Sequence, residues 1–396
     1  MIAQLLKEEV QQYIKDHQHD DPFLLSLQAK KNIAEEADFP WKEAIAQIHS
    51  LQKAKDKIPY WVETKGIIWP APLSVEQSSS EIAARHKAGI IDAQSMIDLT
   101  GGMGVDTVFF AEKVSKIHYV ELRAELADIA KHNFELLGKT NIRVHNLSAE
   151  DFLENFNARV DCIYIDPSRR DQSRKVFKIA DCVPNLYEIL PKCAKISPQV
   201  LVKLSPMVDL SLIIRDFNPA KIWVVSIKNE VKEVLCLLEA RAGQTQISVV
   251  DLAGKAPSLQ FDFDPVEENL TQSEFSLPQQ YIYEPAAGIL KAGAFKLVGK
   301  RFGLKKLHVS SHLYTSDQLV PNFPGKVFLL EAQIREDKKE IARYLPEKQA
   351  NILTRNYPHS PDQLKKKLEL KDGGKNYLIG TVLKDGKKIL LLCVRV

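Results

Sequence analysis

Residues 98–104 read Asp-Leu-Thr-Gly-Gly-Met-Gly, and this stretch is the clearest indication of the fold class. It follows the β-rich run at residues 95–99 and opens a helical pattern. Gly102 and Gly104 would let the backbone approach a ligand closely. In doubly wound α/β sheets, nucleotides bind at the carboxyl end of the first strand. The stretch therefore predicts a nucleotide-binding turn, although such a turn alone is equally typical of a purely structural loop.

Glu121 strengthens the binding interpretation. It ends the second β-rich run, 17 residues after Gly104. In dinucleotide-binding folds, an acid near this offset accepts hydrogen bonds from ribose hydroxyls. We therefore expect Glu121 to hold a free ribose.

The glycine spacing separates the possible ligands. A nicotinamide or flavin fingerprint has G-x-G-x-x-G, but Thr107 stands where its third glycine would be. Asp106 also brings a negative charge into the first helical turn, which disfavours a pyrophosphate. A sulfonium with an amino-acid tail tolerates that charge. The chain has no G-x-x-x-x-G-K-[ST] loop, which argues against a nucleoside triphosphatase.

Strand and helix patterns alternate from residue 95 to residue 240. This alternation predicts an α/β fold, a Rossmann-like sheet of seven mainly parallel strands with helices on both faces. The last two strands are separated by a few polar residues around Lys228-Asn229-Glu230, so one of them should run antiparallel at or near a sheet edge. The expected strands are SMIDL, KIHYVEL, NIRVHNL, DCIYID, QVLVKLS, KIWVVSI and EVLCLLEA.

The N-terminal region is expected to be helical. Trp41, Ile45, Ile48 and Leu51 recur at helical spacing. Further along, Ser78-x-x-Glu81 has the pattern of a capping box and predicts a helix that begins at this serine.

Bulk properties favour a cytoplasmic protein of several domains. A chain of 396 residues is too long for one ordinary core. No apolar run reaches the roughly 18 residues of a membrane span, and the charged N-terminus does not resemble a signal peptide. The five cysteines form no C-x-x-C pair, so we expect reduced thiols, with neither disulfides nor a metal site.

Charge is distributed unevenly. Residues 279–396 carry 22 Lys and Arg against 11 Asp and Glu, whereas residues 1–278 carry 32 against 40. A basic segment on an acidic remainder suggests an anionic partner, most commonly nucleic acid, although a solvated lysine-rich surface would give the same count. The residues proposed to contact such a partner are Lys291, Lys296, Lys300, Arg301, Lys305 and Lys306.

The C-terminal third should be an α+β structure. Asp385-Gly386 lies between two β-rich runs and predicts a hairpin, and the helical stretch PDQLKKKLEL precedes it. Helix plus hairpin fits a ferredoxin-like module. The expected boundaries are 1–58 for a helical domain, 59–240 for the α/β domain, 241–278 for a connector containing β-structure, 279–322 for a small basic ferredoxin-like domain, and 323–396 for a further α+β domain.

Three motifs together resemble a known family. Asp98-x-x-x-Gly102-x-Gly104, Glu121 and Asp166-Pro167-Ser168-Arg169 are similar to the motifs of class I S-adenosylmethionine-dependent methyltransferases, above all those that modify RNA. The similarity covers roughly residues 60–240. The stretches EQSSSEIAARHKA, DPSRR and TRNYPHSPDQLKKKLELKDGGKNYLIGT resemble a bacterial group of these enzymes with a THUMP-like C-terminal domain. THUMP domains bind RNA in several tRNA-modifying enzymes, so the resemblance implies an RNA partner.

The resemblance also implies roles for individual residues. Asp98, Thr100, Gly102 and Gly104 would line the methionine part of S-adenosylmethionine, and Glu121 its ribose. Ser148 stands where the family often has an adenine-binding Asp, so Asp151 or the backbone of Ala149 would replace it. Gln77 and Ser78 would close over the cofactor, or would simply cap a helix.

Asp166-Pro167 would meet the methyl acceptor. A carboxylate at a strand end can accept a hydrogen bond from an amine and orient it, and positioning supplies much of the rate. Arg169 and Arg170 would bind a phosphate or a base edge, although a strand-ending turn with solvated arginines is the alternative. The family's aromatic residue after this motif is replaced by Ser168-Arg169, which argues mildly against adenine N6. Residues 203–206 hold no Cys, so a nitrogen or a ribose oxygen is favoured over pyrimidine C5.

The sequence thus predicts an enzyme that methylates a base nitrogen in rRNA or tRNA, without a metal and away from membranes. Two alternatives stay open. One is a methyltransferase for a small molecule or a protein. The other is an inert RNA-binding protein that retains the fold.

Overall fold

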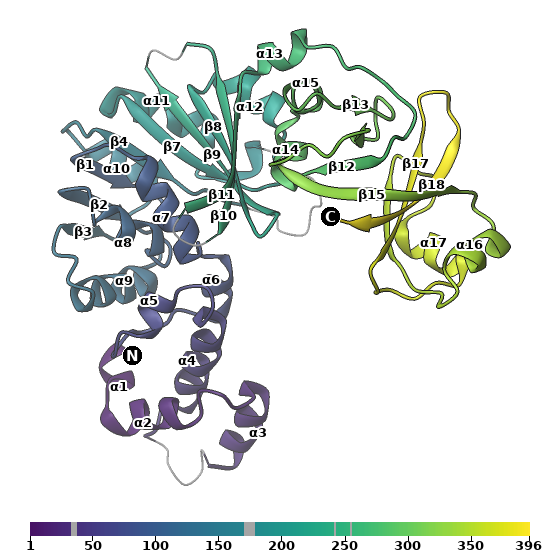
Figure 1. The fold of residues 1–396 in the computed structure, drawn as a ribbon. Coiled ribbons are helices and arrows are strands. Elements are labelled where there is room, and N and C mark those ends of the chain that lie inside the picture. Colours follow the sequence, from purple (N-terminus) through teal and green to yellow (C-terminus); the bar gives the residue numbers. More distant parts are fainter. Residues whose placement is uncertain (33–37, 170–178, 241–242, 254–255) are drawn as a thin grey trace. The chain divides into compact units, whose positions relative to one another are not determined.

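The computed structural model describes residues 1–32, 38–169, 179–240, 243–253 and 256–396 (Figure 1). The chain divides into two compact units. The first unit contains residues 1–220 and 234–243, and the second unit contains residues 221–233 and 244–396.

Helices make up the start of the first unit, as expected. They are α1 (Ile2–Leu5), α2 (Glu8–Asp16), α3 (Pro22–Asn32) and α4 (Trp41–Ala54). Ile45 and Ile48 of α4 are buried in a core shared with the other helices, while Trp41 and Leu51 pack against its margin. The residues that recur at helical spacing in the sequence therefore form the buried face of α4.

The capping box predicted at Ser78 is wrong. Two short helices, α5 (Pro59–Val62) and α6 (Pro72–Gln77), precede α7 (Glu81–Ile90). The Ser78 hydroxyl donates to the Val75 carbonyl at 2.8 Å, so it ends α6. Glu81 accepts the backbone N–H of Tyr60 at 3.0 Å. Pro72 opens a separate helix, and the serine that closes it cannot also open the next.

Two buried amide side chains fix the segment that joins the N-terminal helices to the α/β part. Asn133 donates to the Ile68 carbonyl at 2.8 Å and accepts the Ile68 N–H at 3.0 Å. Gln47 likewise donates to the Trp69 carbonyl and accepts the Trp69 N–H, each at 2.7 Å. The backbone of this buried segment is thus satisfied by side chains rather than by a sheet.

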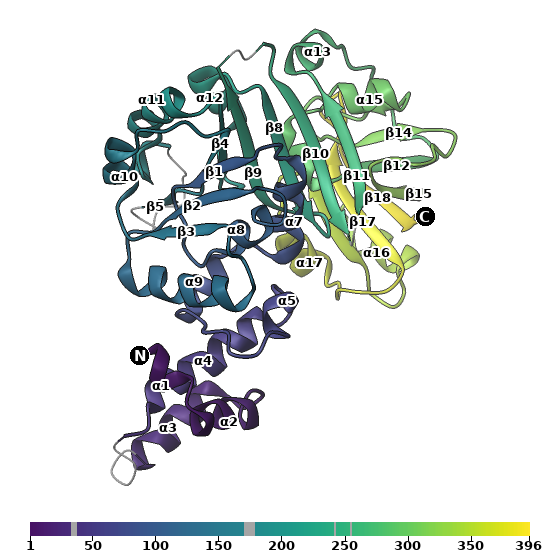
Figure 2. The same cartoon turned by 90° about the vertical axis from the view of Figure 1, so that its left-hand side faces the viewer.

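A row of six adjacent strands, part of a nine-stranded sheet, forms the centre of the first unit (Figure 2). Its order is β9-β7-β4-β1-β2-β3, and all pairs are parallel except β9 with β7. The strands are β1 (Ser95–Asp98), β2 (Lys116–Val120), β3 (Ile142–His145), β4 (Cys162–Ile165), β7 (Gln199–Leu204) and β9 (Glu230–Glu239). A small separate ribbon pairs β5 (Ser168–Arg169) with β6 (Cys182–Val183).

Helices cover both faces of this sheet, as the alternation predicts. They are α8 (Val105–Phe110), α9 (Ala124–Leu136), α10 (Ala149–Asn155), α11 (Leu186–Ile196) and α12 (Leu210–Phe217). The Tyr119 ring of β2 packs on Phe134 of α9 at 5.1 Å, whereas its neighbour His118 packs on Phe152 of α10 at 6.0 Å. Successive strand residues point to opposite faces, so α9 and α10 lie on opposite sides of the sheet.

The pair β8 (Lys221–Ile227) and β9 fits the expected hairpin only in part. Lys228 and Asn229 adopt positive φ at the turn, and β9 runs antiparallel to β7. β8, however, is not an edge strand, because it pairs in parallel with β10 (Gln246–Ala253). β10 in turn pairs antiparallel with β11 (Ala256–Phe263), and α13 (Pro265–Leu270) follows. The residues expected to form a connector thus contain two long strands.

A seven-stranded sheet forms most of the second unit. Its order is β13-β14-β12-β15-β18-β17-β16. Among the described strands of this sheet, β16 and β17 form the one parallel pair. The strands are β12 (Tyr281–Pro285), β13 (Lys305–Lys306), β14 (Tyr314–Ser316), β15 (Gly325–Ile334), β16 (Asn351–Arg355), β17 (Asn376–Val382) and β18 (Lys388–Arg395). β12 pairs with β15 from Tyr281–Leu329 to Pro285–Gly325, so the two expected C-terminal domains share one continuous sheet.

Four short helices complete the second unit: α14 (Ala287–Ala292), α15 (Leu297–Arg301), α16 (Lys338–Tyr344) and α17 (Pro361–Leu368). α17 begins with a capping box between Ser360 and Gln363. The Asp385-Gly386 turn joins β17 to β18 with Gly386 at φ +85°, which confirms the predicted hairpin. None of the helices in the described ranges is both long and apolar enough to cross a membrane.

Candidate active site

Four residues form one row across the carboxyl ends of the central parallel strands of the first unit. The paired strands end with Asp98 beside Tyr119 and beside Tyr164, and with Ile165 beside Val202. Extending this register along the chain gives the order Glu121, Thr100, Asp166 and Lys203 over β2, β1, β4 and β7. Sequence reasoning anticipated this edge and the first three residues, but it did not single out Lys203.

The glycines of residues 98–104 serve two different purposes. Gly104 has φ +84°, and a Cβ there would lie 2.6 Å from the Phe134 ring. At Gly101 a Cβ would lie 2.2 Å from the Tyr119 ring. These two glycines are therefore required by packing. Gly102, at φ +59°, would meet only the Thr100 carbonyl, at 3.8 Å. Gly102 is thus the glycine that leaves room for a ligand.

Glu121 closes this loop from the side. Its Oε2 accepts the Gly102 N–H at 2.8 Å, and its Oε1 accepts the Arg123 N–H at 2.8 Å. The residue is 9% exposed. Below it, the Tyr119 hydroxyl donates to the Gly102 carbonyl at 2.6 Å. Each carboxylate oxygen can accept a further hydrogen bond, so the oriented carboxylate can receive two hydroxyl donors.

Asp98 organises the loop from within. Its Oδ1 accepts the Thr100 N–H at 3.0 Å, and its Oδ2 accepts the Thr107 hydroxyl. Burial raises the pKa of Asp98 to about 7, even though both hydrogen bonds favour the charged form. With both oxygens engaged and 1% exposure, this carboxyl group shapes the loop.

Asp106 does not present an unpaired charge to the ligand side. It forms an ion pair with Lys87 of α7 at 3.3 Å and accepts hydrogen bonds from Ser79 at 2.8 Å and Tyr164 at 2.7 Å. Burial opposes its ionisation, but Lys87 and Lys203, together with these two hydroxyl donors, lower its pKa. The charge of Asp106 therefore disfavours a pyrophosphate less than the sequence suggested, because the buried Lys87 balances it.

Asp166 is joined to the glycine loop and to β7. Its backbone N–H donates to the Thr100 hydroxyl at 2.6 Å, and its Oδ2 forms an ion pair with Lys203. Its side chain is 36% exposed. Pro167 follows it and is half-buried. The side chain of Arg169 and all of Arg170 lie outside the described residues, so their predicted roles have no counterpart here.

The remaining predicted cofactor contacts lie at two places. Ala149 is buried at the start of α10, where the Ser148 hydroxyl accepts the Asp151 N–H at 3.0 Å and donates to its carboxylate at 2.7 Å. This local cap occupies Ser148 and Asp151. Gln77 is exposed at the end of α6. Its neighbour Ser78 is engaged by that helix, and Ser79 is the serine that reaches inward, toward Asp106.

The sequence did not predict the contact between two histidines, one in β2 and one at the end of β3. His118 Nδ1 and His145 Nε2 lie 3.0 Å apart. Burial lowers the pKa of His118 to about 4 and also lowers the pKa of His145. The pair is stacked, with ring centroids 5.2 Å apart. Both rings pack on Phe152 of α10, so their role is in packing.

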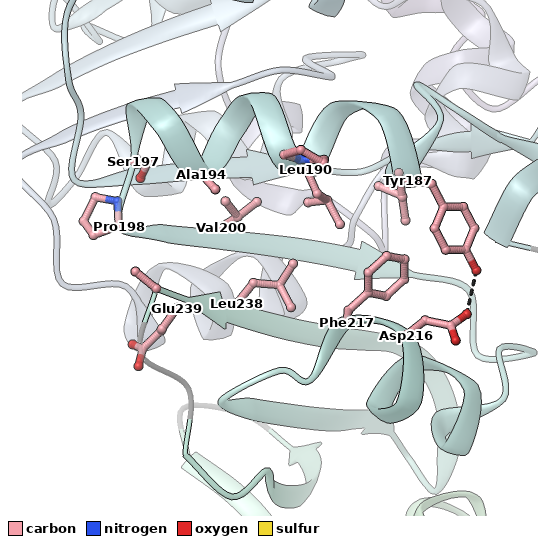
Figure 3. A pocket seen from close by; sticks show the side chains of 13 residues that line it. Tyr187, Leu190, Ala194, Ser197, Pro198, Val200, Asp216, Phe217, Leu238 and Glu239 are labelled. Atoms are coloured by element: carbon pink, nitrogen blue, oxygen red, sulfur yellow. Dashed lines mark hydrogen bonds between the residues drawn. The ribbon is translucent and has the colours of Figure 1, made fainter.

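A separate apolar pocket of about 370 Å³ lies between α11, α12 and the strands β7 and β9 (Figure 3). Val200 and Leu238 form its floor, and the Tyr187 hydroxyl donates to Asp216 at 2.7 Å at one end. Val200 and Lys203 have opposite parity on β7, so the pocket faces away from the row that contains Asp166.

The six predicted RNA-contacting residues are not equivalent. Lys306 is 3% exposed and donates to the Val309 carbonyl at 2.9 Å, so it does not belong to an exposed basic face. Arg301 pairs with Glu267 at 2.9 Å, and Lys296 donates to the Asn269 carbonyl at 2.9 Å. Lys300 and Lys305 are exposed, and Lys291 is half-buried. The six residues therefore do not form one uniform basic surface, because some are held by hydrogen bonds or ion pairs and others are exposed.

The geometry of the loop fits an adenosyl cofactor that carries an amino-acid tail. Open space at Gly102 lies directly beside a carboxylate that can receive two ribose hydroxyls. Nothing in this loop is arranged as a diphosphate cradle, since Gly101 and Gly104 are filled by the Tyr119 and Phe134 rings. The residues present are therefore compatible with S-adenosylmethionine.

Comparisons with known proteins agree with this geometry. A ferredoxin-like domain model matches residues 281–324, and a THUMP domain-like model matches residues 325–395. An uncharacterized S-adenosylmethionine-dependent methyltransferase of Mycobacterium tuberculosis strain H37Rv is 24% identical over 75% of this chain and 80% of its own length. The crystal structure of a "putative methyltransferase from Porphyromonas gingivalis W83" is 31% identical, covers 98% of both chains and superimposes with a TM-score of 0.86.

The fold, the loop with its oriented carboxylate and the end-to-end likeness lead to one assignment. The chain belongs to the S-adenosylmethionine-dependent methyltransferase family that carries ferredoxin-like and THUMP-like C-terminal segments.

Proposed function

We propose that this enzyme methylates a base nitrogen in RNA, in the cytoplasm. The observation that carries the proposal is the row Glu121, Thr100, Asp166 and Lys203, in which a partly exposed carboxylate lies next to the cofactor loop. The THUMP-like match at residues 325–395 supports RNA as the substrate class. The five cysteines, all buried free thiols, agree with a reducing compartment.

In this proposal, Glu121 holds the ribose and Gly102 lets the cofactor approach the backbone. The bound cofactor supplies the methyl group as an electrophile. Asp166 Oδ2 is engaged by Lys203, while no described residue donates to Oδ1. Oδ1 is therefore the atom that accepts a hydrogen bond from the acceptor nitrogen, orients its lone pair, and takes up its proton.

RNA would reach this edge as a single strand or as a flipped base, because a base inside a duplex is not accessible to such a pocket. In the second unit, the exposed Lys300 and Lys305 are the cations proposed to contact phosphates. Such contacts make affinity strongly dependent on salt.

The deciding experiment uses the purified full chain and S-adenosylmethionine labelled in its methyl group. Total bacterial RNA, DNA, protein extract and a metabolite extract are offered separately. The proposal expects label in RNA, and nucleoside digestion then identifies the modified base. Label found only in protein or in metabolites would overturn the RNA assignment and leave the methyltransferase assignment intact.

A further inference from the structure

Lys203 is an unusual residue for its strand. β7 reads Gln-Val-Leu-Val-Lys-Leu, and the four aliphatic residues around the lysine are buried. The Lys203 side chain itself is only 13% exposed. Burying a cation is costly unless it is paired. Its partner is Asp166, the next residue along β4 in the register that places Ile165 beside Val202.

The ion pair leaves Asp166 with two unlike oxygens. Oδ2 is bound by Lys203, and the backbone N–H of the same residue is held by Thr100 at 2.6 Å. Over the part of the chain that the structure describes, Oδ1 receives no donor. Because both the backbone and one oxygen are fixed, Oδ1 points in a defined direction from a carboxylate that is 36% exposed.

Charges of both signs meet at this edge. Three acids, Asp98, Asp106 and Asp166, lie close enough to influence one another, and the buried Lys87 and the half-buried Lys203 accompany them. Lys203 acts on Asp106 as well as on Asp166. A lone Asp166 carboxylate would attract a cationic amine, whereas the neutral Asp166–Lys203 pair does not, and its ammonium repels a second cation nearby.

We propose that Lys203 is a positioning residue for Asp166 that also selects the charge of the methyl acceptor. The pair would take an uncharged nitrogen that carries a hydrogen, such as an exocyclic base amine, and would disfavour an ammonium or a guanidinium. This inference rests on the proposed function, because it assumes that the acceptor meets Asp166.

The test compares Lys203→Met, Lys203→Arg and a control, Lys195→Met, in the full chain. Lys195 lies exposed in the last turn of α11. Transfer of labelled methyl groups to total bacterial RNA gives kcat and KM. Calorimetry with S-adenosylhomocysteine gives cofactor-site affinity, and thermal melting checks folding.

For Lys203→Met we expect kcat to fall on the order of 100-fold, since misplacing a positioning group by about 1 Å has that effect. The KM for RNA and the affinity for S-adenosylhomocysteine should stay within about twofold of wild type, since Lys203 is neither the proposed ribose acceptor nor one of the proposed phosphate contacts. Lys203→Arg should recover most of the lost kcat because it restores the cation, and the control should behave as wild type.

Several results would overturn the inference. Wild-type kcat in a folded Lys203→Met variant removes the positioning role. Failure of Lys203→Arg to exceed Lys203→Met in kcat, with both folded, removes the role of charge. If Lys203→Met does not fold, Lys203→Arg alone is decisive, since a folded Arg variant as inactive as Asp166→Ala contradicts the proposal.

Poly-L-lysine tests the selection of charge. Wild-type enzyme should label it far less than RNA, and equal labelling would refute the preference for an uncharged acceptor. If wild type labels no RNA at all, the proposed function fails, and this outcome is distinct from a normal wild type with an unaffected Lys203→Met variant.

Discussion

Gly102 donates its backbone N–H to Glu121 Oε2 at 2.8 Å, so the loop after β1 is closed against the residue that follows β2. The carboxylate is thereby oriented before any ligand arrives. A preorganised acceptor of this kind costs little to use on binding.

Glu121→Ala should therefore weaken cofactor binding. Hydrogen bonds to a charged group contribute about 1.5–3 kcal/mol each, so the loss of both ribose contacts should reduce affinity by roughly 100-fold or more. Calorimetry with S-adenosylhomocysteine measures this, and Glu125→Ala, an exposed acid in the first turn of α9, is the matched control. Wild-type affinity in Glu121→Ala would show that the ribose is held elsewhere.

Asp166→Ala should separate binding from transfer. In the proposed function its carboxylate meets the acceptor rather than the cofactor, so affinity for S-adenosylhomocysteine should change little while methyl transfer falls by about 100-fold or more. Calorimetry and transfer of labelled methyl groups to RNA are the two measurements. Retained transfer, with binding also intact, contradicts the assigned role of Asp166.

Lys87→Met should destabilise the first unit strongly. Lys87 is fully buried and pairs with Asp106, itself 9% exposed. Removing one member of a buried pair leaves an uncompensated charge and costs about 3–5 kcal/mol. Denaturant unfolding measures the loss. The double variant Lys87→Met/Asp106→Asn should lose less than the sum of the two single variants, and simple additivity would mean that the two charges are not coupled.

Asp98 should make stability depend on pH. Its pKa is about 7 in the folded chain because of burial, well above its ordinary value of 3.8. Between these values the folded state binds more protons than the unfolded state, so the free energy of unfolding falls as pH rises through this window. The full difference corresponds to roughly 4 kcal/mol, taken as an upper bound.

Asp98→Asn tests this linkage because it removes the titrating group and keeps its shape. Relative to wild type, the variant should become more stable as pH rises from 5 to 8, as measured by denaturant unfolding at each pH. Comparison with wild type cancels the contributions of other titrating groups. A difference in stability that is the same at both pH values would place the pKa of Asp98 outside this window.

Lys300→Glu/Lys305→Glu should weaken RNA binding, since both cations are exposed. The slope of log affinity against log salt should drop by about one for each lost phosphate contact. Filter binding over a salt series measures both quantities, and Lys113→Glu on the first unit is the control. Unchanged affinity and slope would make this basic segment a solvated surface. Lys306 is a poor choice for this test because it is buried.

Much of this architecture could be predicted from the sequence, because strand–helix alternation and turn chemistry are local signals. The seven expected strands of the α/β region all formed, and Asp385-Gly386 turned where expected. Failures came where tertiary context decides. The capping box at Ser78 is a local pattern that the preceding helix uses instead. The connector was expected to contain β-structure, and it holds β10 and β11, but their pairing with β8 is not readable from the sequence.

The candidate site shows the same division. Glu121 and Asp166 were recognisable because each ends an apolar strand. Lys203 carried a signal as well, since a lysine inside the aliphatic strand β7 needs a buried partner, but the partner is identifiable only from the register. The pairing of Asp106 with Lys87 joins different helices, and no spacing in the sequence reveals it.

The two units are interleaved along the chain, and this limits where the protein can be divided into fragments. Residues 221–233 belong to the second unit although residues 234–243 return to the first. No single cut in the gene therefore separates the catalytic unit from the C-terminal one. A fragment starting at residue 244 would lack β8 and expose the long edge of β10 that β8 covers. Recombination that exchanges the C-terminal unit intact must carry both of its stretches, so the two units are transmitted together.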